Sequence, residues 1–236
     1  KIYAASTNGI IVAVDAESGK TVWRQKTDYP ITGATGSGNG LVLIGTANSL
    51  VVAFDETNGN ELWQAKVTSE VLAAPVTNGR MVVVQTLDGS LIALDAQTGT
   101  QRWIYENSVP ALTLRGTSAP RIIDNFVISA MANGSIISVA LDNGTLRWEE
   151  RVAIPTGRSD IDRLVDIDGD LTINDAGLII APSYQGYVAA IDTVTGQTRW
   201  RSKESSYVGA GSGFGNIYIV DDLDNIKAYR TGQDTT

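Results

Sequence analysis

The sequence contains no cysteine and no histidine, and each absence excludes a class of chemistry. Without cysteine there is no disulfide and no thiolate metal site, and without histidine the usual general base and metal ligand is missing. No apolar run reaches the roughly 18 residues that a membrane-spanning helix needs. Lys and Arg number 18 against 26 Asp and Glu, and the net charge of −8 disfavours nucleic acid and anionic membrane surfaces as partners.

What the sequence does contain is a repeated skeleton: an Asp, a Gly four residues later, and a Trp four residues after that. A degenerate copy with Gly144 and Trp148 has Ala140 in place of the Asp. All five tryptophans therefore fall at one phase of one repeat. The full copies are Asp15/Gly19/Trp23, Asp55/Gly59/Trp63, Asp95/Gly99/Trp103 and Asp192/Gly196/Trp200.

Each copy of the skeleton predicts a hairpin. A short apolar run rich in β-branched residues precedes the Asp, as in a buried strand. The Asp-to-Gly segment is typical of a hairpin loop, in which the Asp bonds the local backbone and the Gly adopts a positive φ. The Trp follows on the next strand, where its large area suits a position between neighbouring sheets. Further turns such as Asn8-Gly9 and Asp88-Gly89 extend each unit to a four-stranded antiparallel meander.

The spacing of the tryptophans predicts the fold class. Successive distances of 40, 40, 45 and 52 residues indicate an all-β chain, a β-propeller of four-stranded antiparallel blades. The alternative is a β-sandwich with chance repetition. We expect residues 1–236 to form a single propeller fragment of about five and a half blades, with more blades in the complete ring. The expected blades cover residues 1–26 (partial), 32–66, 72–105, 115–151, 163–203 and 207–231 (partial).

The repeat lengthens at two links between blades. Pro75 and Pro120 open equivalent strands 28 residues before a Trp, but the preceding Trp lies 12 residues before Pro75 and 17 before Pro120. The 52-residue interval carries its surplus before Gly177 in the same way. Both insertions join the last strand of one blade to the first strand of the next, and such links share one face of a propeller. Because function concentrates on loops held by a rigid scaffold, these two neighbouring loops are the candidate site.

The first insertion, residues 108–116, carries Leu112, Leu114 and Arg115. The two leucines are two positions apart and share one side of an extended chain. Arg115 adds a donor fork that suits a carboxylate or backbone carbonyls. The alternative is that both leucines are core residues of a strand.

The second insertion, residues 156–170, holds five Asp within eleven residues. One alternative to a binding role is a solvated acidic loop, or a loop ordered by Asp–Arg pairs. Another is a calcium loop, since Asp166, Asp168 and Asp170 match positions 1, 3 and 5 of an EF-hand. Against calcium, Leu171 stands at the Gly position and Gly177 at the Glu position.

The repeat, the segment VPALTLRGTSAP (109–120) and the segment DIDRLVDIDGD (160–170) together resemble the BamB family. Members are lipoprotein subunits of the bacterial outer-membrane β-barrel assembly machinery and carry a PQQ-like propeller repeat. The resemblance covers essentially the whole chain. It implies an eight-bladed propeller at the periplasmic face of the outer membrane of a Gram-negative bacterium. The family is anchored there through a lipidated N-terminal Cys, which this chain lacks.

The resemblance also implies a function: a non-catalytic scaffold without cofactor or metal that binds a POTRA domain of BamA and aids insertion of outer-membrane proteins. Unfolded clients are a further expected partner, through strand addition at an exposed sheet edge. Two other functions stay open, a quinone-cofactor dehydrogenase and a ligand-binding propeller outside the machinery. The implied contact residues are Leu112, Leu114, Arg115, Asp166 and Asp168, with Asp162 and Arg163 in support.

Overall fold

The computed structural model describes residues 1–107, 118–152, 167, 171–183, 187–206 and 208–230. Every regular element within these ranges is a β-strand, and they hold no helix that could cross a membrane. The chain forms two compact units. The first comprises Lys1–Asn107 and Leu141–Gly144, and the second comprises Ser108–Ala140 and Thr145–Thr236.

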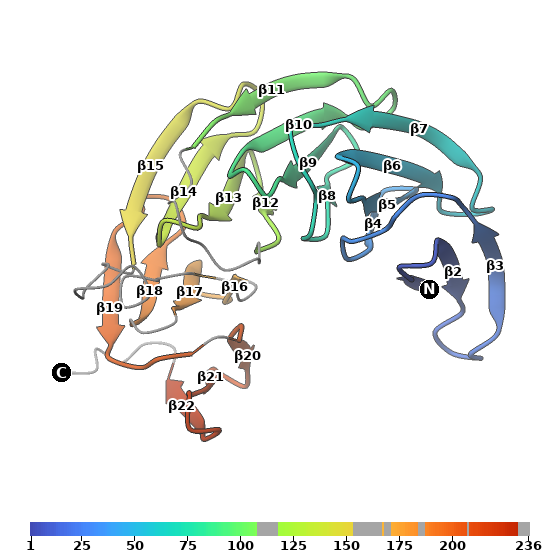
Figure 1. Ribbon diagram of the computed structural model, residues 1–236. Coiled ribbons are helices and arrows are strands. Elements are labelled where there is room, and N and C mark those ends of the chain that lie inside the picture. The colour runs from blue at the N-terminus through green and yellow to red at the C-terminus, as the bar shows by residue number, and fades with distance from the viewer. Residues whose placement is uncertain (108–117, 153–166, 168–170, 184–186, 207, 231–236) are drawn as a thin grey trace. The chain divides into compact units, whose positions relative to one another are not determined.

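Three antiparallel sheets make up the first unit, and in each of them strands that follow one another in the chain are hydrogen-bonded neighbours (Figure 1). Each sheet is therefore a meander. The strands are β1 (Ile2–Ala5), β2 (Ile10–Val14) and β3 (Thr21–Lys26) in the first sheet; β4 (Gly36–Gly38), β5 (Leu41–Gly45), β6 (Leu50–Asp55) and β7 (Glu61–Lys66) in the second; and β8 (Val76–Thr77), β9 (Met81–Gln85), β10 (Leu91–Asp95) and β11 (Gln101–Tyr105) in the third.

The second unit repeats this plan in three further meanders. Its strands are β12 (Arg121–Ile123), β13 (Phe126–Ala130), β14 (Ser135–Ala140) and β15 (Leu146–Arg151) in the first sheet; β16 (Thr172–Ile173), β17 (Leu178–Pro182), β18 (Val188–Asp192) and β19 (Thr198–Ser202) in the second; and β20 (Gly211–Gly213), β21 (Asn216–Val220) and β22 (Ile226–Arg230) in the third.

Each full Asp of the repeat organises its hairpin as the sequence predicts. In the β6–β7 hairpin, Asp55 Oδ1 accepts hydrogen bonds from the backbone N–H of Thr57 at 2.7 Å and of Asn58 at 3.1 Å. The N–H of Gly59 donates to the carbonyl oxygen of Asp55 at 2.8 Å. Gly59 has a φ of +75°, which glycine adopts without the steric cost of a Cβ.

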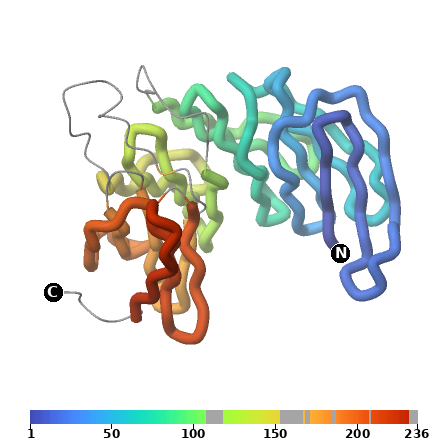
Figure 2. Tube along the Cα trace, turned by 60° about the horizontal axis from the view of Figure 1, so that its bottom comes forward, coloured from blue at the N-terminus to red at the C-terminus, as the bar shows by residue number. Residues whose placement is uncertain are grey.

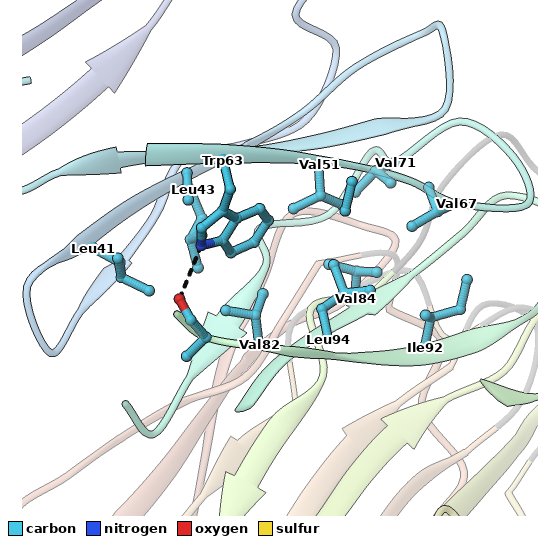
Figure 3. Close-up of a cluster of buried hydrophobic side chains, with 13 residues drawn as sticks. Leu41, Leu43, Val51, Trp63, Val67, Val71, Val82, Val84, Ile92 and Leu94 are labelled. Carbon is cyan, nitrogen blue, oxygen red and sulfur yellow. Dashed lines mark hydrogen bonds between the residues drawn. The ribbon is translucent and has the colours of Figure 1, made fainter. Parts of the chain in front are cut away.

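The structure gives the glycine a second role that the spacing alone does not reveal. A Cβ placed on Gly99 would lie 2.6 Å from Cε3 of Trp63, on the preceding sheet. In the same contact the indole N–H of Trp63 donates to the carbonyl oxygen of Ala96 at 2.9 Å (Figure 3). The repeat therefore encodes the contact between consecutive sheets as well as the turn. A Cβ on Gly59, Gly144 or Gly196 would likewise lie 2.5–2.7 Å from the indole ring of Trp23, Trp103 or Trp148, respectively.

The core lies between consecutive sheets. In the first unit, Val51 and Trp63 of the second sheet pack with Val82 and Leu94 of the third (Figure 3). The sheet at the N-terminus, blue in Figure 2, packs on its neighbour in the same way. Burying each such side chain stabilises the fold by about 1.5–3 kcal/mol. The expectation of an all-β chain made of four-stranded antiparallel sheets is confirmed, with three strands in the first and last sheets of the described chain.

Candidate partner-binding site

The side chains predicted to contact a partner all lie outside the described residues. They are Leu112, Leu114, Arg115, Asp162, Arg163, Asp166 and Asp168. The structure instead describes the segments from which their two loops rise. These stems define where the two loops leave and rejoin the sheets.

Both insertions fall in links between sheets. The link from β11 to β12 spans residues 106–120, and the link from β15 to β16 spans residues 152–171. The equivalent links elsewhere are shorter, at residues 27–35, 67–75 and 203–210. Each long link leaves the last strand of one sheet and enters the first strand of the next. The spacing of the Trp residues predicts the additional residues at these two links.

The exits of the two loops are joined directly. Arg121 opens β12 at the end of the first link, and Leu171 is the last residue of the second link. The Nε–H of Arg121 donates a hydrogen bond to the carbonyl oxygen of Leu171 at 3.2 Å. Both residues belong to the second unit, so this contact is internal to one compact body. It sets the ends of the two loops next to each other.

The second loop is also held by apolar side chains. Val152 at its entry and Leu171 at its exit are fully buried, and Ile167 between them is 2% exposed. All three pack in one core cluster with residues of the β12–β15 and β16–β19 sheets, among them Ile136 and Ile179. The N–H of Val152 donates to the backbone of the β13–β14 turn, at the carbonyl oxygen of Gly134, 3.0 Å away. The loop thus starts, touches and ends on the sheet core.

The first loop returns to the sheet through a buried stem. Ser118 is 1% exposed, and Ala119 and Pro120 are buried beside it, directly before Arg121. The residues directly before the exit of this loop are therefore buried. Consequently, the point at which the first loop rejoins its sheet is set both by the packing of these buried residues and by the Arg121 hydrogen bond.

Sequence reasoning did not single out Arg121 or Ile167. Arg121 follows Pro120 at the start of a short strand, where a basic residue normally faces solvent, so spacing gave no signal for it. Ile167 carries one sequence signal: an apolar residue between two acids in a loop indicates a side chain that packs on the core.

The metal and quinone alternatives concern acidic clusters and exposed aromatic side chains. Among them, no three acidic side chains come together as metal ligands, and the three Asp of the calcium alternative lie outside them. A quinone site needs an exposed aromatic floor. Trp23, Trp63 and Trp103 are each at most 8% exposed, and their indole N–H groups are bonded to backbone carbonyls of the neighbouring repeat.

Comparison with known sequences identifies relatives that match more than nine tenths of the chain. A family model described as outer membrane protein assembly factor BamB matches residues 7–233. The protein of that name from Pseudomonas aeruginosa is 58% identical over 218 residues, which are 92% of this chain and 57% of the relative. The one from Alkalilimnicola ehrlichii is 49% identical over 228 residues, 97% of this chain and 59% of the relative. The chain thus spans less than two thirds of these relatives.

Solved structures agree with the sequence relatives. The crystal structure of BamB from Moraxella catarrhalis superposes with a TM-score of 0.89 at 29% identity, over 97% of this chain and 69% of that chain. This match confirms the β-propeller class. A quinohemoprotein alcohol dehydrogenase from Pseudomonas putida HK5 has a TM-score of 0.68 at 15% identity over 85% of this chain and 40% of that chain, and shares the fold alone. The sequence relatives are named assembly factors and not enzymes.

Proposed function

The chain belongs to the family of outer membrane protein assembly factor BamB, and on that basis we propose that it is a non-catalytic scaffold for assembling β-barrel outer-membrane proteins. It works at the periplasmic face of the outer membrane, within an assembly complex, and binds a POTRA domain of BamA. The complete protein is a single eight-bladed propeller, of which this chain supplies consecutive blades.

The observation that carries the binding proposal is the hydrogen bond between Arg121 and Leu171. It supports a single binding surface, because it fixes the ends of the two long loops within one hydrogen bond of each other. A rigid stem also lowers the entropy lost when a partner orders the loop side chains. One partner domain that touches the first loop is thereby brought to the second.

The two loops contribute different chemistry to this surface. Leu112 and Leu114 form its apolar anchor, the kind of contact that usually carries most of the binding energy. Arg115, Asp166 and Asp168 set the orientation and the encounter rate more than the affinity.

Calorimetric titration with isolated POTRA domains tests the proposal. We expect one domain to bind the wild-type chain, and Leu112→Ala and Asp166→Arg each to weaken that binding by about tenfold, since truncated anchors commonly cost 1 kcal/mol or more. The melting temperature should stay within about 1 °C of wild type, as for other surface substitutions.

Asp142→Arg is the matched control. Asp142 is exposed in the β14–β15 hairpin loop, which lies at the opposite end of its sheet from the inter-sheet links. The variant makes the same charge change as Asp166→Arg and should bind like wild type. Failure of every POTRA domain to bind, or equal losses in the control and the loop variants, would overturn the proposal. Unfolding of Leu112→Ala would show instead that this leucine belongs to the core.

A further inference from the structure

One turn at the C-terminal end of the chain departs from its counterparts. The turns β1–β2, β5–β6, β9–β10, β13–β14 and β21–β22 share one hydrogen bond, from the N–H of the fourth turn residue to the carbonyl oxygen of the first. The third residue of these turns is Asn8, Asn48, Asp88, Asn133 and, in the last one, Leu223. Leu223 is 77% exposed. An apolar side chain thus occupies the tip at which the other described turns carry a polar one.

In two of these turns the polar residue at this position accepts a backbone hydrogen bond. Asn133 Oδ1 accepts the backbone N–H of Ser135 at 3.0 Å, and Asp88 Oδ1 accepts that of Ser90 at 3.2 Å. Leucine offers no such acceptor. In the β21–β22 turn the carboxylate of Asp221 replaces it.

Asp221 Oδ1 accepts the N–H of Leu223 at 3.0 Å and that of Asn225 at 2.9 Å. The turn is therefore complete without a polar tip, and the leucine side chain plays no part in holding it. Single exposed leucines are common on protein surfaces, so exposure alone indicates nothing. The first residue also holds the β1–β2 and β5–β6 turns, where Ser6 Oγ accepts the N–H of Ile10 at 3.3 Å and Thr46 Oγ1 accepts that of Leu50 at 2.9 Å. What distinguishes Leu223 is that the residue at the tip of such a turn is apolar.

The turn is also rigid. Lys227 Nζ lies 2.5 Å from Glu204 Oε2 and 3.1 Å from Asp221 Oδ2, and the hydroxyl of Tyr229 donates to Glu204 Oε1 at 3.0 Å. Hydrogen bonds from Asn225 keep the pKa of Asp221 well below its usual value, so its carboxylate stays charged. Leu223 is thus presented on a cross-linked turn, and a preorganised anchor loses little freedom on binding.

The turn lies on the same edge of the second unit as the ends of the two long loops. The N–H of Asp222 donates to the carbonyl oxygen of Ser205 at 3.1 Å, in the 203–210 link. At the end of that link, the carbonyl oxygen of Ala210 accepts a hydrogen bond from the hydroxyl of Thr172, which directly follows Leu171. Together with the Arg121 contact, these bonds connect the exits of both loops to the 203–210 link and its turn. We call this edge the connection edge.

We propose that Leu223 is a further anchor for the partner domain, which meets it with an apolar pocket bordered by basic side chains. Asp222 and Asp224 flank the leucine and are both exposed, so basic groups on the partner complement them. This inference rests on the proposed function, because the partner is the domain that the loops of the connection edge bind. It extends the contact surface across the sheet β20–β22.

The closing experiment exchanges Leu223 for the residue that the other turns use. Leu223→Asn removes the apolar tip and keeps a side chain that the turn accepts. The matched control is Phe214→Asn. Phe214 is fully exposed at the β20–β21 turn, at the opposite end of the same sheet, and Asn39 holds the equivalent position of β4–β5 with the same φ of +51°. Each variant replaces one exposed apolar tip by asparagine.

Binding is measured by calorimetry with the POTRA domain that binds the wild-type chain. Leu223→Asn should weaken binding by about tenfold at an unchanged melting temperature, and Phe214→Asn should bind like wild type. If Leu223→Asn binds normally while Leu112→Ala does not, the inference is wrong and the proposed function stands. Equal losses from Leu223→Asn and Phe214→Asn also overturn the inference. If no POTRA domain binds the wild-type chain, the proposed function fails and this inference fails with it.

Discussion

Arg121 and Leu171 are 50 residues apart in the chain, and the side chain of the first is hydrogen-bonded to the backbone of the second at 3.2 Å. Arg121 directly follows the 106–120 link, and Leu171 is the last residue of the 152–171 link. The proximity of the two loops is therefore a property of their stems, built into the start of β12 and the end of the 152–171 link. Variants of the stems and of the sheets test this picture without touching the loops.

Arg121→Met removes the hydrogen bond and retains most of the length of the side chain. We expect the free energy of unfolding to fall by about 1 kcal/mol, the usual net value of one hydrogen bond. Affinity for the POTRA domain should fall as well, because the loop exits are no longer tied together. Urea denaturation and calorimetry measure the two effects on the same protein.

Arg147→Met is the control for that variant. The guanidinium of Arg147 lies 3.9 Å from the ring centroid of Phe126, near the start of β15 and so at the other end of the same sheet. Losing this cation–π contact should cost a similar 0.5–1 kcal/mol, roughly. Affinity should not change. A loss of affinity in this variant equal to that of Arg121→Met would mean that general destabilisation, and not the stem, weakens binding.

Gly99→Ala tests the contact between consecutive sheets. The new Cβ would lie 2.6 Å from Cε3 of Trp63, so the indole has to move. We expect a loss of about 2–4 kcal/mol, from overpacking added to the strain of a left-handed backbone. Thermal and urea unfolding measure this loss.

Gly19→Ala separates the two contributions. Gly19 has nearly the same φ, +68° against +71°, but a Cβ there meets nothing within 4 Å. This variant should lose only the strain component, about 1–2 kcal/mol. Equal losses at Gly19 and Gly99 would show that the glycine serves the turn alone and that the Trp contact adds nothing.

Acid should weaken the hairpins of the repeat. Arg102, 2.6 Å from Asp95, holds the pKa of that carboxyl at about 2, and Arg199, 2.8 Å from Asp192, does the same there. Since the folded pKa is below the ordinary value of 3.8, this stability is present in full above that value. It is lost as the pH falls from about 4 towards 2.

Asp95→Asn provides the comparison, because it keeps an oxygen acceptor for the turn and has no titrating carboxyl. Its stability at neutral pH should be lower than that of the wild type, and it should decline less steeply between pH 4 and 2. Urea denaturation at a series of pH values measures both slopes. A variant that declines as steeply as the wild type would rule out Asp95 as a source of the acid sensitivity.

Much of the fold follows from the sequence because the repeat is local. Asp55 and Gly59 fix a turn through bonds that span four residues, and alternation or continuity of apolar residues fixes the strands around it. Even the contact between sheets was implied by the regular phase of the tryptophans. The contact of the Trp63 ring with Gly99 does not follow from the sequence, because Gly99 lies 36 residues further on. The turn that Gly99 closes already explains why a glycine stands there.

The stems could not be predicted in the same way. Arg121 bonds a backbone carbonyl, which carries no sequence signal, and its partner is remote in the chain. Leu223 shows the opposite case. The turn series was visible in the sequence, but only the observed hydrogen bonds of Asp221 show that the turn does not need a polar tip. The residues of the two loops themselves stay predictions.

Hydrogen–deuterium exchange with and without the POTRA domain tests the central claim most directly, because it follows each segment separately. If both loops form one surface, amides in residues 108–117 and 153–170 become protected together, at the same partner concentration, while the 141–144 hairpin loop at the opposite end of its sheet exchanges as before. Protection of that hairpin loop, or of only one of the two long loops, would contradict a shared surface.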